Sequence, residues 1–255
     1  MNPIDTRTIK SILDAGEIIL KSGGEVNRVE DTITRMCLAY GFLRADVFTI
    51  TSSIVVTVQT AQGEMITQTR RIYGYDTNLQ RVHHINQLAR QVCDSPLPIH
   101  SLEEEIEKIK NTPTLSLKKN MMVHALIAAV FSVFYGGGLR ECCIGALIGV
   151  GLCLLLHYGE SVIQNPLLRY FFCSAIGSLG ICLFYHGGID FNREAVALGN
   201  IMLLIPGLAL TNAIRDMMNG DTVSGLLRLC DSLLRALAIA AGFISIMTLI
   251  GGFLS

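Results

Sequence analysis

The sequence predicts a membrane α-helical protein with five transmembrane helices and an N-terminal cytoplasmic α+β domain. Of the 255 residues, 51% are hydrophobic, and the long apolar runs all follow Lys118-Lys119. The residues before that point are mixed and polar, as in a soluble domain. The first residues contain no apolar run of the kind found in a cleavable signal peptide. We therefore expect the first part of the chain to stay in the cytoplasm.

Residues 1–100 carry the periodicities expected of the α+β domain. Apolar residues at helical spacing predict one helix from about 9 to 20, which ends at Gly23-Gly24. A second helix from about 26 to 40 is predicted to end at Gly41. Alternation over 47–58, with Phe48 on the apolar face, predicts one half-buried strand. A turn at Gln62-Gly63 then leads to a hairpin partner over 65–72.

The rest of the domain is predicted to be helical and to lead to the membrane. Apolar positions from Val82 to Val92 indicate a third helix. Ser101 and Glu104 have the spacing of a capping box, which predicts that a short charged helix begins there. We therefore assign 101–117 to a juxtamembrane linker helix.

Five apolar runs predict a transmembrane domain over 118–255. They cover roughly 120–137, 142–158, 167–186, 194–213 and 231–254. A spanning helix needs about 20 mostly apolar residues, and shorter spans of about 17 occur. The helical core of a large soluble protein is the alternative, but five such runs leave no amphipathic helix to cover them.

The distribution of Lys and Arg predicts the orientation. Cytoplasmic loops carry an excess of these residues. One side of the five spans would hold most of them, and the other only Arg140 and Arg193. We expect the richer side to be cytoplasmic, with the C-terminus outside. Its basic residues are Lys108, Lys110, Lys118, Lys119, Arg169, Arg215, Arg228 and Arg235.

Small residues in the second span predict close helix packing. Gly145 and Gly149 form a G-x-x-x-G face, and such faces let helices approach closely in lipid. Two interpretations stay open at this point. The face packs within the chain, or it forms the interface of a homo-oligomer.

The N-terminal domain offers few candidates for chemistry. Its clustered polar residues are Glu25, Arg28, Glu30 and Asp31, and their helical spacing is typical of surface ion pairs. No metalloprotease, P-loop or nucleophile-elbow motif occurs in the sequence. We therefore expect no catalytic residues, metal or cofactor, and we predict that these four residues couple or gate another activity. The net charge of −1 gives no reason to expect a nucleic-acid partner.

Pro206-Gly207 interrupts the fourth apolar run, and polar residues flank this break. Proline removes a helical hydrogen bond, and broken backbone is tolerated at membrane depth only where it is covered or lines a cavity. Discontinuous helices of this kind form substrate sites in secondary transporters. A kinked span with an ordinary charged loop is the alternative. The predicted translocation site comprises Asn200, Pro206, Gly207, Thr211, Asn212, Arg215 and Asp216.

Two motifs resemble the signatures of the threonine/serine exporter family. SGGEVNRVEDTITRMCLAYG, over 22–41, is similar to S-G-A-E-x-x-R-V-E-D-T, with Gly24 in place of alanine. IPGLALTNAIRDMMNGDTVSGLLR, over 205–228, matches every position of P-G-x-x-x-x-N-A-x-x-D-x-x-x-G-D-x-x-x-G. The resemblance extends over nearly the whole chain.

The resemblance implies a subunit of a secondary transporter. Fused members have ten spans, so a five-span chain resembles the split form, which works with a small partner membrane subunit. Threonine and serine are the solutes implied for the fused form, and a dicarboxylate such as succinate for the split form. A membrane-anchored enzyme or a sensor, acting through the cytoplasmic domain, is the alternative function.

Overall fold

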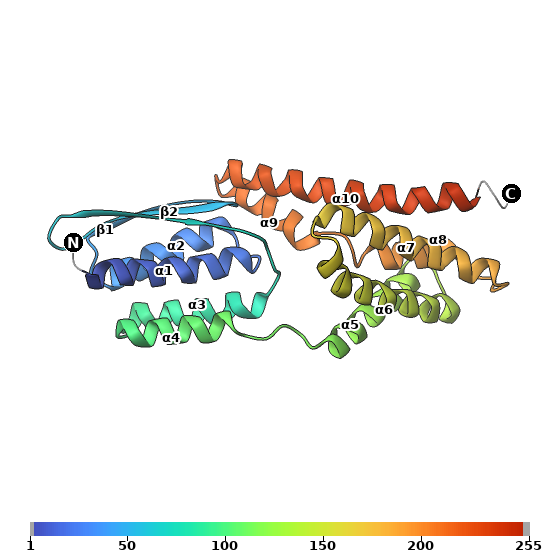
Figure 1. The fold of residues 1–255 in the computed structure, drawn as a ribbon, viewed down its shortest axis with the longest axis horizontal. Coiled ribbons are helices and arrows are strands. Elements are labelled where there is room, and N and C mark those ends of the chain that lie inside the picture. The colour runs from blue at the N-terminus through green and yellow to red at the C-terminus, as the bar shows by residue number, and fades with distance from the viewer. Residues whose placement is uncertain (1–2, 252–255) are drawn as a thin grey trace. The chain divides into compact units, whose positions relative to one another are not determined.

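A computed structural model describes the backbone of residues 3–251 and the side chains of residues 5–249 (Figure 1). The chain divides into two compact units. The N-terminal unit contains the described residues up to Thr114 together with Leu208–Cys230. The helical unit contains Leu115–Gly207 and the described residues from Asp231 onward.

In the N-terminal unit, helices α1 (Pro3–Lys21) and α2 (Val26–Ala39) lie between a sheet and a second pair of helices (Figure 1). The sheet is an antiparallel meander of β1 (Arg44–Ile50), β2 (Ser53–Gln59) and β3 (Met65–Arg71). The second helix pair is α3 (Leu79–Asp94) and α4 (Ile99–Lys110). The core lies between these layers and includes Ile12, Ile33, Ile54, Ile85 and Leu102.

Both helix ends predicted from glycine are confirmed. Gly23 and Gly41 follow α1 and α2 with φ of 91° and 86°, a backbone region that strongly favours glycine. Helix α4 begins at Ile99, two residues before the predicted capping box, with Pro98 at its N-cap. Leu102, Ile106 and Ile109 are buried, so α4 packs as part of the N-terminal unit.

The single strand predicted over 47–58 is wrong, because this segment is a hairpin. Ile50 pairs with Ser53, so Thr51 and Ser52 form a two-residue turn. The turn changes which residues of the first strand face inward. Thr49 pairs with Ile54 and is buried, whereas Phe48 is 63% exposed. The strand predicted over 65–72 is confirmed as β3, which pairs with β2.

Among the described residues, four helices are long and apolar enough to cross a membrane. They are α5 (Leu117–Phe134), α6 (Leu139–Val162), α7 (Pro166–His186) and α10 (Thr222–Gly251), with the apolar part of α10 ending at Leu249. The first nine residues of α10, Thr222–Cys230, belong to the N-terminal unit and the described remainder to the helical unit. Four of the five predicted runs therefore lie on single long helices.

The fourth predicted span, 194–213, is not one helix. It consists of α8 (Arg193–Ile201), a non-helical segment over 202–206, and α9 (Gly207–Met218). Pro206 explains the break, because its ring excludes the backbone hydrogen bond that a continuous helix needs. Helix α9 belongs to the N-terminal unit, and α8 belongs to the helical unit.

Close contacts at glycine determine the packing of α5, α6 and α8. A Cβ added at Gly149 of α6 would lie 2.9 Å from the carbonyl oxygen of His124 in α5. One added at Gly199 of α8 would lie 2.7 Å from the backbone nitrogen of Ser132. The Gly145/Gly149 face is therefore filled by α5 of the same chain. Of the two interpretations, this contact favours packing within the chain and removes this face from a homo-oligomer interface.

Helices α7 and α10 run parallel. Ser174 donates a hydrogen bond to the carbonyl of Ile239 (2.7 Å), and Ser178 donates one to Phe243 (3.3 Å). The second bond lies four residues further along both helices, so α7 and α10 run in the same direction. The chain must return between these two helices. With 9 residues, α8 is about 13 Å long, against about 31 Å for the 21 residues of α7. Helix α8 therefore covers only part of that return.

Candidate functional site

The predicted translocation residues fall in two places. Asn200, Pro206 and Gly207 belong to the helical unit, and the residues from Thr211 to Asp216 belong to the N-terminal unit. Each group has its own polar environment.

In the N-terminal unit, the two family-like motifs meet at what we call the motif junction, formed by Gly23–Val26 with Asn212, Arg215, Asp216 and Arg228. The amide nitrogen of Asn212 donates to the Gly23 carbonyl (2.8 Å). A guanidinium nitrogen of Arg228 donates to the Gly24 carbonyl (2.8 Å). These bonds satisfy carbonyls in the segment between α1 and α2, where no helical partner is present.

Asp216 is the centre of the motif junction. Its side chain is fully buried, and Oδ1 accepts the backbone N–H of Val26 at 3.1 Å. Val26 is the first residue of α2, so this carboxylate satisfies one of the N–H groups that have no partner within the helix. The other oxygen lies 3.3 Å from Nε of Arg228, an ion pair without hydrogen-bond alignment. Burial raises the pKa of Asp216, although Arg228 and the Val26 N–H both lower it.

The four predicted gating residues lie on or beside α2. Glu25 forms ion pairs with Arg215 and, at 3.5 Å, with Arg28. Asp31 forms an exposed pair with Arg35 at 2.7 Å. Glu25, Arg28 and Asp31 also line an open groove between α2 and α3. The spacing therefore correctly indicated surface ion pairs, and it missed the link from Glu25 to α9.

Glu30 differs from the other three. Its carboxylate accepts the backbone N–H of Thr49 at 2.7 Å, which ties α2 to β1. Burial raises the pKa of Glu30, and the Thr49 N–H partly offsets this. The carbonyl of the same Thr49 accepts a bond from the Ser224 hydroxyl of α10 at 3.3 Å. Sequence reasoning missed Thr49 and Ser224, because only the hairpin turn brings Thr49 inward.

In the helical unit, Asn200 lies at a small cavity next to the helix break. The side chain is 4% exposed, and its amide nitrogen donates to the Val196 carbonyl at 2.9 Å. Its Oδ1 has no hydrogen-bond partner among the described residues. Such a buried acceptor costs about 1–3 kcal/mol, so its presence calls for a reason.

The cavity has a volume of about 10 Å³, enough for about one water molecule. Its polar lining is Asn200 with the hydroxyls of Ser174 and Ser178, and none of its described lining residues is ionisable. The remaining lining residues are Leu152, Gly177, Ile181, Ala197, Ile201, Leu204 and Phe243. Pro206 and Gly207 do not line it, but Leu204 of the interrupted segment does.

The structure also shows a polar link that sequence reasoning missed. Glu141 lies near the start of α6, and its two carboxylate oxygens accept the backbone N–H groups of Gly138 (2.7 Å) and Asn192 (2.8 Å). Asn192 is the N-cap of α8, so Glu141 fixes the start of the interrupted helix. A carboxylate at the third position of a helix is a known capping pattern, and that spacing was a signal in the sequence.

Long apolar helices, an interruption of the helix before Pro206 and a small cavity beside it are features found in membrane transporters. A family model described as "Putative threonine/serine exporter" matches residues 10–250. The chain therefore belongs to the threonine/serine exporter family, and the resemblance in its two motifs is confirmed.

Curated relatives fall into two sizes. The chain is 24% identical over 239 residues to "Probable succinate transporter subunit YjjP" of Klebsiella aerogenes, covering 91% of this chain and 90% of that protein. It is 23% identical to the protein of the same name from Escherichia coli, covering 94% and 93%. It is 22% identical to "Probable threonine/serine exporter" of Mycobacterium tuberculosis, covering 94% of this chain but only 46% of that protein. No solved structure gave a significant match.

Proposed function

We propose that the chain is one half of a secondary transporter that exports a small polar solute from the cytoplasm. The observation that carries the proposal is the unpartnered Asn200 oxygen in a cavity beside an interrupted helix. Transporters form solute sites from such helices, because the freed polar groups can bind the solute. Membership in an exporter family supports the same function and favours a non-enzymatic role.

The lining of the Asn200 cavity favours a solute without net charge. Burying an ion without a partner is expensive, and none of the described lining residues could balance a carboxylate. Because the cavity holds about one water molecule, it would receive only a small neutral group, and the hydroxyl of threonine or serine suits Asn200 and the two serines. Succinate would need a cationic partner here. We therefore propose threonine or serine as the solute, and succinate is the alternative.

We further propose that the chain crosses the cell membrane five times, with its N-terminus in the cytoplasm. Parallel α7 and α10 support an odd number of crossings, since the chain must return between them through α8 and the following segment. The predicted translocation path includes this segment. It runs from Asn200 through Pro206 and Gly207 and continues along α9 as far as Asp216.

The proposed transporter also needs a partner subunit. Relatives of this length are named as a transporter subunit, and the M. tuberculosis relative is about twice as long. A second half would begin outside and be inverted relative to the first, which is a common transporter plan. We propose that a small membrane subunit supplies this half, and that Glu25, Arg28, Glu30 and Asp31 couple the cytoplasmic domain to transport.

Asn200→Leu tests whether the cavity belongs to the path. The change removes both polar atoms, and it also removes an unpartnered buried acceptor, so stability should hold or rise. Efflux of labelled threonine is measured in cells that express the chain with its partner. We expect efflux to be lost and the apparent Tm to be retained.

Leu198→Ala is the matched control, because Leu198 is on α8, does not line the cavity and is largely exposed. We expect it to leave efflux unchanged. Normal efflux by Asn200→Leu would remove the cavity from the path. A lower apparent Tm with loss of protein would make Asn200 a structural residue.

A further inference from the structure

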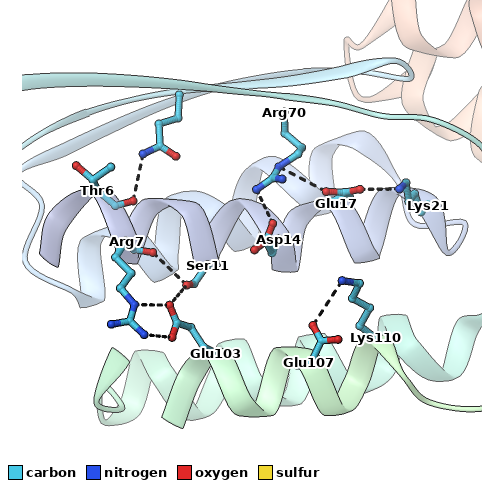
Figure 2. Close-up of polar contacts among 11 residues, drawn as sticks. Thr6, Arg7, Ser11, Asp14, Glu17, Lys21, Arg70, Glu103, Glu107 and Lys110 are labelled. Atoms are coloured by element: carbon cyan, nitrogen blue, oxygen red, sulfur yellow. Dashed lines mark hydrogen bonds and ion pairs between the residues drawn. The ribbon is translucent and has the colours of Figure 1, made fainter. Parts of the chain in front are cut away.

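The N-terminal unit contains an open pocket of about 760 Å³ between α1 and α4. This volume lies within the range of small-molecule sites, about 300–1,000 Å³. Figure 2 shows α1 and α4 facing each other, with Arg70 reaching α1 from β3. Charged side chains of both signs line the pocket, among them Lys10, Asp14, Glu17, Lys21, Glu107 and Lys110.

A bidentate ion pair fixes the spacing of the two helices at one end of this pocket. Arg7 of α1 donates to both carboxylate oxygens of Glu103 in α4, at 2.7 Å and 2.6 Å. The Ser11 hydroxyl donates to the carbonyl of Arg7 at 3.0 Å (Figure 2). Such fork-to-fork pairs are geometrically specific, so α1 and α4 keep a defined separation where the pocket begins.

Asp14 and Glu17 supply negative charge to the pocket from α1. Arg70 is shared between Asp14 and, at 3.5 Å, Glu17, and Glu17 also pairs with Lys21 at 2.6 Å. Burial raises the pKa of Asp14, and Arg70 offsets only part of this increase. The Asp14 side chain is 37% exposed, so a further cation can reach its carboxylate from the pocket.

Lys10 of α1 and Lys110 of α4 add positive charge to the same pocket. Each of them lowers the pKa of Asp14, although burial raises it overall. Lys110 has a loose pair with Glu107 at 3.5 Å, and Figure 2 shows both side chains directed from α4 toward α1. Lys10 has no ion pair with any other described residue.

We propose that this pocket binds a free α-amino acid, with the ammonium group at Asp14 and the carboxylate between Lys10 and Lys110. The lining holds five basic residues (Lys10, Lys21, Arg70, Arg81, Lys110) and four acidic ones (Asp14, Glu17, Glu103, Glu107). This near balance, with both signs side by side, suits a zwitterion better than a dianion. Binding here would let the domain respond to the cytoplasmic concentration of the solute. This regulatory role rests on the proposed function, whereas the binding itself does not.

Calorimetric titration of the purified full-length chain tests the ligand class. The probes are threonine, N-acetylthreonine, which lacks the ammonium, threonine amide, which lacks the carboxylate, and succinate. We expect threonine to bind, and each derivative to bind at least about tenfold more weakly, because each loses charge-assisted bonds. Absence of threonine binding, equal binding of the derivatives, or tighter binding of succinate would overturn the proposal.

Variants then locate the binding. Asp14→Asn and Lys110→Met should each weaken threonine binding about tenfold or more. Lys108→Met is the matched control, since Lys108 also pairs with a glutamate three residues earlier on α4 but does not line the pocket. Asn200→Leu should retain binding even if efflux is lost. If Asn200→Leu loses threonine binding and Asp14→Asn keeps it, the bound threonine lies in the translocation path. That result would overturn the proposal, whatever the efflux of either variant.

Discussion

Substitution of Asp216 separates a structural role from a functional one. Asparagine keeps an oxygen that can accept the Val26 N–H and removes only the negative charge. Because burial raises the pKa of Asp216 despite Arg228, folding disfavours the charged carboxylate relative to the unfolded chain. We therefore expect Asp216→Asn to change the free energy of unfolding by less than about 1 kcal/mol, a typical small mutational effect.

Alanine at the same position has a larger expected cost. It leaves the Val26 N–H buried without an acceptor, which costs about 1–3 kcal/mol. For a chain of this size, each kcal/mol shifts Tm by about 2–4 °C. Asp216→Ala should therefore lower the apparent Tm by about 2–12 °C, on the same scale.

The pH dependence has a definite sign. An acid with a raised pKa in the folded state stabilises the fold fully below its unfolded pKa, and this contribution is lost as pH rises through the folded pKa. The stability of the native chain relative to Asp216→Asn should therefore fall as pH rises from the ordinary aspartate pKa, about 4, through the raised pKa of the folded state. Using the variant as reference cancels the other titrating groups, which both proteins share.

The assay is thermal unfolding of the detergent-purified chain, with efflux measured in parallel. We expect Asp216→Asn to keep its expression and Tm and to lose efflux, since the proposed path includes this carboxylate. If Asp216→Asn destabilises the chain as much as Asp216→Ala, the reasoning from the pKa of Asp216 is refuted. If Asp216→Asn and Asn212→Ala both export normally, this segment is not part of the path.

Three further results are expected. Gly149→Ala should destabilise the chain by about 1–3 kcal/mol, because its Cβ would meet the α5 backbone. Gly151→Ala is the control, since nothing lies near its Cβ, and thermal unfolding should show almost no change. Arg28→Glu breaks a partly exposed ion pair of at most about 1 kcal/mol and adds a like-charge repulsion of similar size beside Glu25. Efflux should therefore change while Tm changes little, and unchanged efflux would argue against gating. A reporter fused to the C-terminus should be outside the cell, and a cytoplasmic reporter would contradict five crossings.

Local patterns predicted much of the helical fold. Apolar spacing located α1, α2 and α3, because each buries one stripe against the same core. Alternation failed over 47–58, since it continues across a two-residue turn and gives no signal of the reversal at Thr51-Ser52. Run length located α5, α6, α7 and α10, but it could not show that α8 and α9 would pack in different units.

The candidate site was predictable by residue type and not by contact. Asp216 and Asn212 stood out as polar residues after a helix break, and the structure joins them to Val26 and Gly23, nearly 190 positions away. No periodicity reports a contact at that separation. Arg228 was noted only as a basic residue, because its role depends on two segments that meet only in the folded chain.

Export by the chain with and without its partner tests the central claim most directly. Cells that lack their own exporter are loaded with labelled threonine, and efflux is compared for the chain alone, the partner alone and both together. We expect efflux only when both are present. Full export by the chain alone, or no export of threonine, serine or succinate by the pair, would contradict the proposed half-transporter.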